Sequence, residues 1–569
     1  MRITIEHDRR YRRNATINFI SHLPIVCAVI FCMLPNFSSG IPYASDEPFH
    51  LARIMSLADA LREGIFPVKV HPNLCYGLGY GVGFFYDNAL IYFPAVLILA
   101  GVTLENAYKI FILGVFIAIA ASMYYSCKRL TNNTVIASFA AAMYLLSNRI
   151  VGQLYVDFTI GNLCGAIFLP LAIAGIDIWV KEKKSRGMFI AGFTGLLYTH
   201  AITTLLAFSV CLLIAIVNIR TIVREKKIFI GLVLASVFVF LLSMAYWLPM
   251  WQQFHAQTYK SAAPWTTEEQ NVVSISGLIT DTRGIGILMV LTLFISIVFA
   301  IIIHSRVRTT WNERGKEILT FLLLGALYMV IPCIHVFWHL VNIRFTLIQF
   351  PARLFMPASV LVTFVFAIEL TMITSGSSEA KASKGAIGIC TALCLIGAIY
   401  ICFAIYPNSF ENADRKIIEE VEDYTIAGAG AGQEWLPIET NLDELKNNVD
   451  SAIAEDGSAV KGEKEDQNSR YSFQADLSHQ YYDVPYIYYR GYIATDENGR
   501  EYEVDKNPQN GLVRVLIPEQ QTGNEIITVQ YHDTKYAKFA YGVSLISMIT
   551  GITYLFLKRR KDNLHLTKA

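Results

Sequence analysis

Apolar runs long enough to cross a membrane recur along this chain. A transmembrane helix needs about 20 mostly apolar residues, although shorter helices occur inside large bundles. The chain is 54% hydrophobic and only 16% charged, which is unusual for a soluble protein. We predict a mainly α-helical, polytopic membrane protein with about twelve transmembrane helices. The predicted spans are residues 17–34, 107–127, 134–148, 163–180, 187–199, 202–219, 228–248, 284–304, 318–337, 354–374, 386–406 and 537–557.

Basic clusters between these runs predict the orientation. Lysine and arginine are enriched in the cytoplasmic loops of membrane proteins. All the clusters fall on one side if residues 89–100 form a short helix at the outer face and not a span. The clusters are Arg12-Arg13, Lys128-Arg129, 181–186, 224–227, 306–314, Lys381 with Lys384, and 558–561. We therefore predict that both termini are cytoplasmic, and that residues 35–88, 249–283 and 407–535 lie outside.

Net charge and cysteine positions argue against two classes of protein. The formal net charge of +1 gives no reason to expect a nucleic-acid partner. Most of the ten cysteines lie inside apolar runs, and the long segment after Pro407 contains none. A disulfide framework or a cysteine-based zinc site is therefore not expected.

The first outer loop opens with a predicted helix that carries three polar side chains on one face. Asp46, His50 and Arg53 follow one another at spacings of four and three residues, and Gly64 marks the end of the helix. This pattern predicts a polar site at the membrane surface. In the alternative interpretation, Asp46 caps the helix, His50 is a solvated interfacial residue and Arg53 reaches toward lipid phosphate.

The same loop continues with a segment, residues 76–86, that alternates glycine with aromatic and other apolar residues, including Tyr80 and Tyr86. It lacks the Gly-Lys-Ser/Thr ending of a nucleotide-binding P-loop. An aromatic, pliable loop against lipid or a sugar face fits this pattern, and plain anchoring at the membrane interface fits it equally.

A second polar constellation, Gln349-Phe350-Pro351-Ala352-Arg353, precedes the span predicted at 354–374. An arginine at the outer end of a span runs against the usual charge bias, and a guanidinium suits bidentate contact with phosphate. The alternative is an arginine that contacts lipid head groups. His200 also reaches the predicted outer face, at the tip of a short hairpin, where a lone histidine is more often structural than catalytic.

Several motifs in a fixed order resemble the bacterial YfhO-like family, which is similar to the GT-C glycosyltransferase superfamily. They are residues 46–54, the loop 76–86, residues 245–249, 349–353, 488–492 and 511–515. Some relatives carry the label "6-pyruvoyl-tetrahydropterin synthase-related". The chain shows no histidine triad of a soluble zinc synthase, so we do not expect that activity.

The resemblance implies an inverting transfer of sugar from a polyprenyl-phosphate donor to an acceptor on the outer face. Asp46 would be the general base or would orient the acceptor, Glu47 would be able to replace it, and Arg353 would hold the donor phosphate. The residues implied or predicted to bind substrate are His50, Arg53, Tyr80, Tyr86, His200, Gln349 and Arg353. The segment 157–162 departs from the Arg-x-x-x-Gly-Glu pattern of many relatives.

The resemblance also implies partners and a location. They are a polyprenyl-phosphate sugar, an envelope polymer such as a teichoic acid or polysaccharide, membrane lipid, and a separate polyprenyl-phosphate sugar synthase, all at a bacterial plasma membrane. Some GT-C members use a divalent metal ion and others do not. Asp46 and Glu47 alone provide too few ligands to assign one.

Turn and strand patterns divide the chain into three regions. Residues 1–406 would form the GT-C-like membrane domain with its first outer loop at 35–106, and 537–569 a last span with a basic tail. Between them, 407–536 would form an extracytoplasmic domain whose strand-rich part, at about 469–535, is a small β-sandwich. A run of alternating alanine and glycine at 427–432 predicts a flexible linker.

Two other classes of function stay open. A transporter or flippase for a lipid-linked saccharide predicts ionisable residues at mid-membrane and repeated halves. Neither is evident, because Asp177 and Glu369 lie toward the cytoplasmic ends of their predicted spans. A scaffold for envelope assembly would be non-enzymatic, and Asp46 and Arg353 would be dispensable to it.

Overall fold

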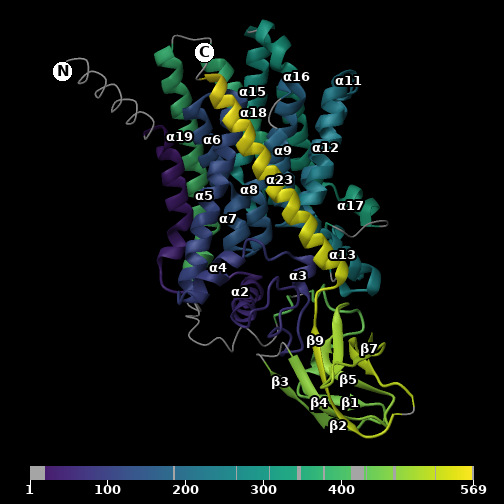
Figure 1. Ribbon diagram of the computed structural model, residues 1–569. Helices are drawn as coiled ribbons and strands as arrows, with labels where there is room; N and C mark the ends of the chain where they lie inside the picture. The colour runs from purple at the N-terminus through teal and green to yellow at the C-terminus, as the bar shows by residue number, and fades with distance from the viewer. Residues whose placement is uncertain are drawn as a thin grey trace, which may run out of the picture. The chain divides into compact units, whose positions relative to one another are not determined.

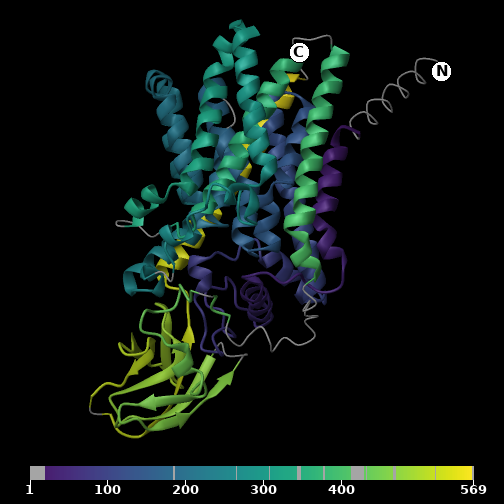
Figure 2. The ribbon, with the colours of Figure 1, turned by 180° about the vertical axis from the view of Figure 1, so that it is seen from behind.

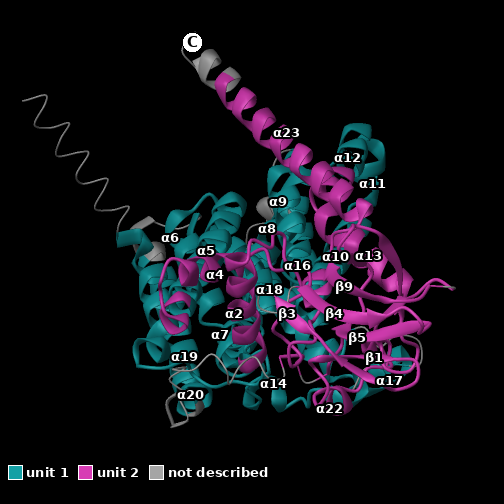
Figure 3. Ribbon diagram, turned by 60° about the horizontal axis from the view of Figure 1, so that its bottom comes forward, with its two compact units in different colours: residues 1–47, 108–235, 266–418 teal, residues 48–107, 236–265, 419–569 magenta. Residues whose placement is uncertain are grey.

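The computed structural model describes residues 20–566, except 184–185, 264–265, 307, 343–347, 376–378, 412–427, 431, 466–469 and 520. The chain forms two compact units (Figure 3). Unit 1 consists of Met1–Glu47, Tyr108–Ala235 and Thr266–Ile418, and unit 2 of Pro48–Ala107, Ser236–Trp265 and Glu419–Ala569.

Unit 1 is helical. It begins with the helix Ile20–Phe37. It continues with α5 (Leu104–Thr131, of which 104–107 lie in unit 2), α6 (Thr134–Leu145), α7 (Asn148–Tyr155), α8 (Ile160–Glu182), α9 (Arg186–Leu197), α10 (Ala201–Val217), α11 (Ile219–Arg224), α12 (Lys226–Leu242, of which 236–242 lie in unit 2), α14 (Gly277–Thr280), α15 (Ile287–Arg306), α16 (Arg308–Val330), α17 (His335–Asn342), α18 (Phe355–Ser375), α19 (Glu379–Ala404) and α20 (Tyr406–Glu411).

Helix α18 forms the centre of unit 1, because its neighbours α6, α15, α16 and α19 cover it and almost every residue of its first four turns is buried (Figures 1 and 2). Helices α8 and α9 approach one another closely through glycine. A Cβ at Gly192 would lie 2.5 Å from the backbone nitrogen of Ala172, and one at Gly175 would lie 2.6 Å from that of Phe189. Small residues let helices pack closely, and in lipid such packing drives helix association because the hydrophobic effect between helices is absent.

All twelve predicted spans coincide with helices, but fewer than twelve helices are long enough to cross a bilayer. The described residues contain eight sufficiently long apolar helices, or up to ten if each of two bent pairs is one span. The pairs are α6 with α7, bent by 41°, and α12 with α13 (Met244–Ala256), bent by 71°. Helices α9 and α10 are apolar but shorter. Hydropathy identifies apolar helix but does not measure its unbroken length.

The basic loops of unit 1 meet one another, as expected if they lie on one side of a membrane. Three contacts join them: Lys181 Nζ with Glu317 at 3.0 Å, Lys183 Nζ with Glu225 at 3.1 Å, and Arg314 Nη1 with the carbonyl of Leu130 at 3.1 Å. These residues belong to the loops or ends of α5, α8, α11 and α16. That this side is the cytoplasm remains our prediction.

Unit 2 combines short helices with one antiparallel sheet. Its helices are α2 (Glu47–Arg62, whose first residue lies in unit 1), α3 (Val82–Phe85), α4 (Tyr92–Leu99), α13, α22 (Leu442–Leu445) and α23 (Lys535–Leu566). Its strands are β1 (Ser451–Ala454), β2 (Ala459–Lys461), β3 (Glu463–Glu465), β4 (Arg470–Asp476), β5 (Tyr481–Ile487), β6 (Tyr492–Asp496), β7 (Glu501–Lys506), β8 (Leu512–Leu516) and β9 (Asn524–Tyr531). The helix predicted after Ser45 is therefore present as α2, and α4 lies within the segment 89–100.

The sheet runs in the order β2-β1-β5-β8-β7-β6-β9-β4-β3. Its inward side chains alternate along the strands, as in β4, where Tyr471, Phe473 and Ala475 are buried. The ends of the sheet approach each other, because Tyr471 donates to the carbonyl of Asp450 beside β1 at 3.2 Å. The sheet is thus barrel-like where we predicted a sandwich, and it begins before residue 469, with three strands in a charged stretch.

An ion pair on β5 and β8 offers a test of the sheet. Asp483 is buried, and its carboxylate accepts from Arg514 at 2.7 and 3.0 Å and from Asn507 at 2.7 Å. Asp483→Asn should cost about 2 kcal/mol, since a mostly buried guanidinium loses its counter-charge. Hydrogen exchange of the β5 and β8 amides in the full chain should accelerate about 30-fold. Exposed Glu503→Gln on β7, which lies opposite Leu516, is the control, and equal exchange in the two variants would contradict the expectation.

Alkaline phosphatase fusions test the orientation, because the enzyme is active only outside the cytoplasm. A fusion after Lys183, among the basic loops, should be inactive, and one after Thr282, in a loop predicted to lie outside, should be active. Immunoblots control for expression. Reversed activities would overturn the predicted orientation.

Candidate functional site

In unit 1, backbone hydrogen bonds hold Asp46 next to Asp157. The amide of Ser45 donates to the carbonyl of Val156 at 3.2 Å, and the amide of Asp46 donates to that of Asp157 at 3.0 Å. The segment that leads into α2 is therefore paired with the segment between α7 and α8. The side chain of Asp46 is half-buried. The structure thus places a carboxylate predicted to be catalytic beside a second carboxylate.

Two arginines neutralise Asp157. Its Oδ2 lies 3.4 Å from Nη1 of Arg149, and its Oδ1 accepts from Nε of Arg283 at 2.7 Å. The Arg149 side chain is only 5% exposed, whereas that of Arg283 is 51% exposed. Desolvation opposes the charge on Arg283, yet Asp157, with contributions from Asp281 and Asp46, raises the pKa of this group. Asp46 therefore belongs to one electrostatic cluster with these residues.

Asn148 fixes the loop that supplies Arg283. From the start of α7, its Nδ2 donates to the carbonyl of Gly284 at 2.8 Å and to that of Thr282 at 3.1 Å. The loop approaches closely, since a Cβ at Gly152 would lie 3.0 Å from the Thr282 carbonyl oxygen. Helix α7 thus holds both arginines, Arg149 directly and Arg283 through the loop.

Polar contacts link Asn162 through Thr203 to His200, and the charge of Arg353 acts on His200. Thr203 Oγ1 donates to Asn162 Oδ1 at 2.8 Å and lies 2.9 Å from Nδ1 of His200. The same nitrogen accepts from the Thr203 amide, so His200 caps α10. Burial, followed by the charge of Arg353, lowers the pKa of His200 to about 3. The segment 157–162 therefore has the Asp46 cluster at one end and the His200 side at the other.

Arg353 lies in the short helical turn η5 (Pro351–Leu354) just before α18. Its Nη1 donates to the carbonyl of Ile348 at 2.6 Å and to Oε1 of Gln349 at 3.3 Å. Gln349 has a φ of 60°, a conformation uncommon for a residue with a side chain. Fully buried Glu268 secures this backbone, because its Oε1 accepts from the amides of Ile348 at 2.7 Å and Gln349 at 3.0 Å.

The predicted site residues divide between the two units. Asp46, Glu47, His200, Gln349 and Arg353 belong to unit 1, where Glu47 is buried, and the others belong to unit 2. Of the three residues predicted to share a face of α2, Asp46 therefore belongs to unit 1, whereas His50 and Arg53 belong to unit 2. The remaining residues are His50, Arg53, Tyr80 and Tyr86.

In unit 2, Arg53 forms part of a buried network. It is 2% exposed, and its Nη2 donates to the carbonyl of Tyr86 at 2.7 Å and to Oδ1 of Asn88 at 2.9 Å. Burial lowers the pKa of Arg53 to about 10, against the opposing effects of Tyr86 and Asp87. Asn88 lies 3.0 Å from Nε2 of His71, whose pKa burial lowers to about 3. These contacts tie α2 to the segment before α4, so Arg53 has a structural task whatever its role toward substrate.

The ring of Tyr86 lies between two predicted site residues. The guanidinium carbon of Arg53 stands 4.4 Å from the Tyr86 ring centroid, and the ring of buried His50 stands 5.6 Å from it. Tyr80 is fully buried and donates to the carbonyl of Ala429 at 3.1 Å. Tyr80 therefore packs inside unit 2 and does not line an open loop.

The loop 76–86 was expected to be pliable, but its glycines instead allow neighbouring groups to pack closely against the backbone. A Cβ at Gly81 would lie 2.4 Å from the Tyr489 ring, and one at Gly83 would lie 2.7 Å from the carbonyl oxygen of Val68. The described part of the predicted linker at 427–432 is packed in the same way, since a Cβ at Gly428 would lie 2.7 Å from Leu74. The structure thus packs Gly428 closely where the sequence predicts a flexible linker, because small side chains serve proximity as well as flexibility.

The donor set does not favour a resident divalent metal. Within the described residues, no group of three or more histidine, cysteine, aspartate or glutamate side chains is placed to hold one. Both Asp157 oxygens already face guanidinium groups, which compete with a cation. Of the candidate metal ligands named from sequence, Glu47 is buried and Asp46 half-buried.

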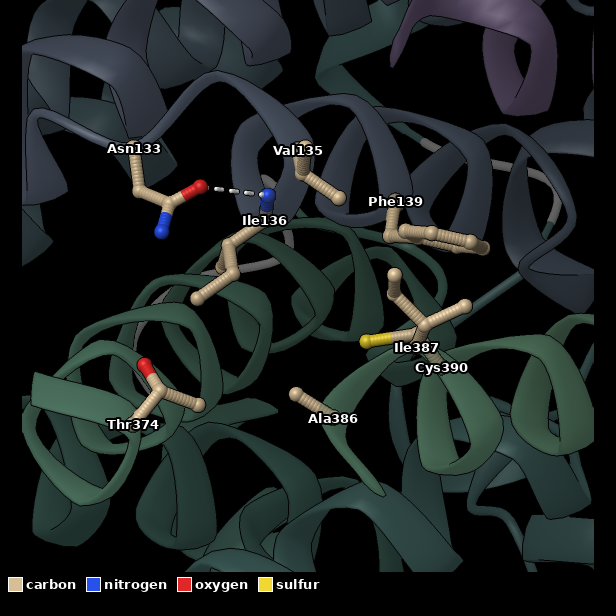
Figure 4. A pocket seen from close by; sticks show the side chains of 8 residues that line it. All are labelled: Asn133, Val135, Ile136, Phe139, Thr374, Ala386, Ile387 and Cys390. Carbon is tan, nitrogen blue, oxygen red and sulfur yellow. Dashed lines mark hydrogen bonds between the residues drawn. The ribbon is translucent and has the colours of Figure 1, made fainter. Parts of the chain in front are cut away.

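A crevice of about 110 Å³ in unit 1 has none of these residues in its lining (Figure 4). Asn133, at its edge, accepts from the amide of Ile136 at 3.1 Å and so caps α6. The other lining side chains are apolar or weakly polar, such as Thr374 and Cys390. This crevice offers no charged group to a substrate.

The sequence interpretation missed Asp157, Arg149, Arg283 and Glu268 as members of the site. Asp157 was noticed only as a departure from a pattern. A signal did exist, since Arg149 directly follows the predicted span 134–148, and an arginine that is buried there requires a carboxylate partner. The partner of Arg149 stands eight residues later in the chain, a distance at which helical spacing gives no guidance.

No family model matches the chain. It is 25% identical over 230 residues to an uncharacterized protein of Lactococcus lactis subsp. cremoris (strain MG1363). The matched region covers 39% of this chain and 37% of that protein. Among solved structures it is similar to the oligosaccharyltransferase of Archaeoglobus fulgidus in its apo form, with a TM-score of 0.36 and 13% identity over 72% of this chain. The same values of TM-score and identity apply to that archaeon's AglB in complex with an inhibitory peptide and a dolichol-phosphate, over 71% of this chain. The chain spans 56% of either solved chain.

The lowered pKa of His200 predicts acid sensitivity. His200 is neutral in the folded chain, whereas an unfolded histidine titrates near 6.5. Its contribution to the free energy of unfolding is therefore fully present above about pH 6.5 and is lost as the pH falls toward 3. His200→Asn can keep the cap on α10 but cannot titrate. Between pH 7.5 and 5, the melting temperature of the wild type should fall more than that of the variant. Parallel melting curves would show that His200 is not enclosed as described.

Proposed function

We propose that this chain is a membrane glycosyltransferase of GT-C type that moves a sugar from a polyprenyl-phosphate donor to a cell-envelope glycopolymer on the outer face. The observation that carries the proposal is the pairing of Asp46 with Asp157 in a cluster with Arg149 and Arg283. This cluster supplies a base together with cations, which suits transfer away from a phosphate. The motif resemblance supplies the type of enzyme.

In the proposed reaction, the acceptor hydroxyl attacks the anomeric carbon of the donor sugar. The oxygen–carbon bond forms as the bond from that carbon to the phosphate oxygen breaks, which inverts the configuration. The acceptor proton passes to the Asp46 carboxylate, and the released polyprenyl phosphate retains the electron pair as negative charge. A fixed carboxylate and a fixed cation serve these two needs without a nucleotide.

Arg353 is the residue we assign to the leaving phosphate. Its guanidinium is held by Ile348 and Gln349, and the backbone of those residues is held by Glu268. A cation whose position is fixed before the reaction stabilises developing charge without reorganisation. Burial keeps His200 neutral nearby, so it adds no competing positive charge.

Asp157 has a supporting role in this proposal. With a guanidinium on each oxygen it is a weak base, whereas Asp46 lies at the edge of the cluster and is half-buried. The backbone bond between the two residues would set the position of Asp46 toward an acceptor. The donor lipid would reach the site from the bilayer, after a separate synthase has made it.

Transfer of radiolabelled sugar from synthetic polyprenyl-phosphate donors to envelope extract tests the proposal. With the purified chain in lipid nanodiscs, Asp46→Asn should lower kcat about 10²- to 10⁴-fold, as expected for loss of a general base. Arg353→Lys should lower kcat by about 10²-fold, because a compact ammonium cannot reproduce the guanidinium contacts. Asp456→Asn, in the turn between β1 and β2, is the control.

The result also separates the alternatives. Full transfer by folded Asp46→Asn would remove the catalytic assignment. A flippase would instead move a fluorescent lipid-linked saccharide between leaflets of vesicles without releasing polyprenyl phosphate. A scaffold would do neither, and both variants would support envelope assembly as the wild type does.

A further inference from the structure

Unit 2 contains a cavity of about 250 Å³ that the proposed reaction does not use. It lies between the segment that follows α2 and the strands β4, β5, β6 and β9. Its volume falls just below the range of about 300–1,000 Å³ typical of sites for drug-sized ligands. The cavity therefore suits one small ring with its linkages leading outward.

Three tyrosines form an aromatic wall of this cavity. Tyr486 and Tyr492 stack with ring centroids 5.6 Å apart and an angle of 25°, and Tyr531 packs edge-on against Tyr492 at 5.6 Å. Gly79 borders the cavity beside this wall, since a Cβ there would lie 3.5 Å from the Tyr492 hydroxyl. Aromatic rings with polar tips offer an apolar surface beside hydrogen-bonding groups.

The polar lining combines donors with acceptors. Arg470 donates through Nε to Oε1 of Gln530 at 3.3 Å, and Glu63 lines the cavity from the end of the α2 segment. A guanidinium, an amide and a carboxylate together match hydroxyl groups, each of which both donates and accepts. This mixture does not match a purely apolar ligand.

The charges argue against an anionic ligand. Arg470 already lies 3.6 Å from Glu465, and Lys69, which also lines the cavity, lies 3.7 Å from Asp87. The nearby carboxylates offset both cations, and Glu63 would repel a phosphate or a uronic acid. A neutral ligand remains.

We propose that this cavity is a saccharide-binding site that takes one neutral pyranose ring of a glycan. The inference deepens the proposed function, because only that function makes the glycan the acceptor polymer. The aromatic wall contacts the apolar face of the ring, and Arg470, Gln530 and Glu63 bind its hydroxyl groups. The site would retain the polymer through a unit other than the one that reacts.

Binding to the full chain in lipid nanodiscs tests the site without any donor. The probes are the neutral trisaccharides of glucose, galactose, mannose and N-acetylglucosamine, with trigalacturonate as the anionic comparison. Titration calorimetry should detect at least one neutral probe at millimolar concentration or below, and weaker binding of trigalacturonate. Saturation-transfer NMR should show ring protons of the bound probe in contact with aromatic protein protons.

Two variants localise the binding. Arg470→Ala and Gln530→Ala should each weaken it about 10-fold, as expected for loss of hydrogen bonds that include a charged donor. Arg470 is 43% exposed on its strand, so its replacement leaves the sheet core intact. Arg500→Ala, in the turn between β6 and β7, removes the same charge outside the cavity and should bind as the wild type does. Absence of binding by every neutral probe, or unchanged affinity in both variants, would overturn the proposal.

Transfer kinetics distinguish failure of this inference from failure of the proposed function. If both hold, Arg470→Ala raises KM for the acceptor and leaves kcat unchanged, whereas Asp46→Asn lowers kcat and keeps saccharide affinity. Binding without any transfer would retain the cavity and remove the enzyme. Transfer that depends on Asp46 but is unaffected by Arg470→Ala and Gln530→Ala would support the enzyme and overturn the saccharide site.

Discussion

The buried guanidinium of Arg149 imposes a constraint on which much of unit 1 depends. A charge with a side chain only 5% exposed must meet an opposite charge inside the protein, because isolated charges are costly to bury. Asp157 meets this need, and its position fixes the segment between α7 and α8. That segment in turn provides the carbonyl groups to which Ser45 and Asp46 donate. The need to neutralise Arg149 thus determines the position of Asp46, the residue to which we assign the role of base.

The same logic of buried polar groups recurs around Arg353. Glu268 is fully buried and satisfied by two backbone amides, so a loop with an unusual dihedral angle at Gln349 is kept in one conformation. Unit 2 solves a similar problem around Arg53, where carbonyl and amide oxygens replace a carboxylate. Arg53 and the loop that holds Arg353 are thus each fixed by groups from segments distant in sequence.

The sequence was informative about apolar helices and turn chemistry. The location of twelve apolar helices followed from hydropathy, and α2 followed from its boundary residues, because both signals are local. Unbroken length was not predictable, because each bent pair is apolar enough to pass as one span despite its bend. The strands before residue 469 were missed because short, charged edge strands such as β3 lack the alternation by which buried strands are recognised.

The site was less accessible to sequence reasoning. Asp46, His200, Gln349 and Arg353 could be named as candidates from residue type and position. Asp157 and Glu268 could not be, because their significance lies in partners that the fold brings from far along the chain. Conversely, the helical spacing of Asp46, His50 and Arg53 suggested a shared surface, whereas Arg53 is buried and donates hydrogen bonds within a network inside unit 2. Spacing defines a face but not what covers it.

The backbone pairing of Asp46 has a consequence for variation at this position. Because its main-chain amide, and not its carboxylate, makes the described bond to Asp157, that anchor is indifferent to the side chain. A substitution at residue 46 therefore keeps this hydrogen bond, although it removes the charge that Asp46 contributes beside Arg283. Main-chain anchoring and the proposed reactivity of the carboxylate thus depend on different atoms of the same residue.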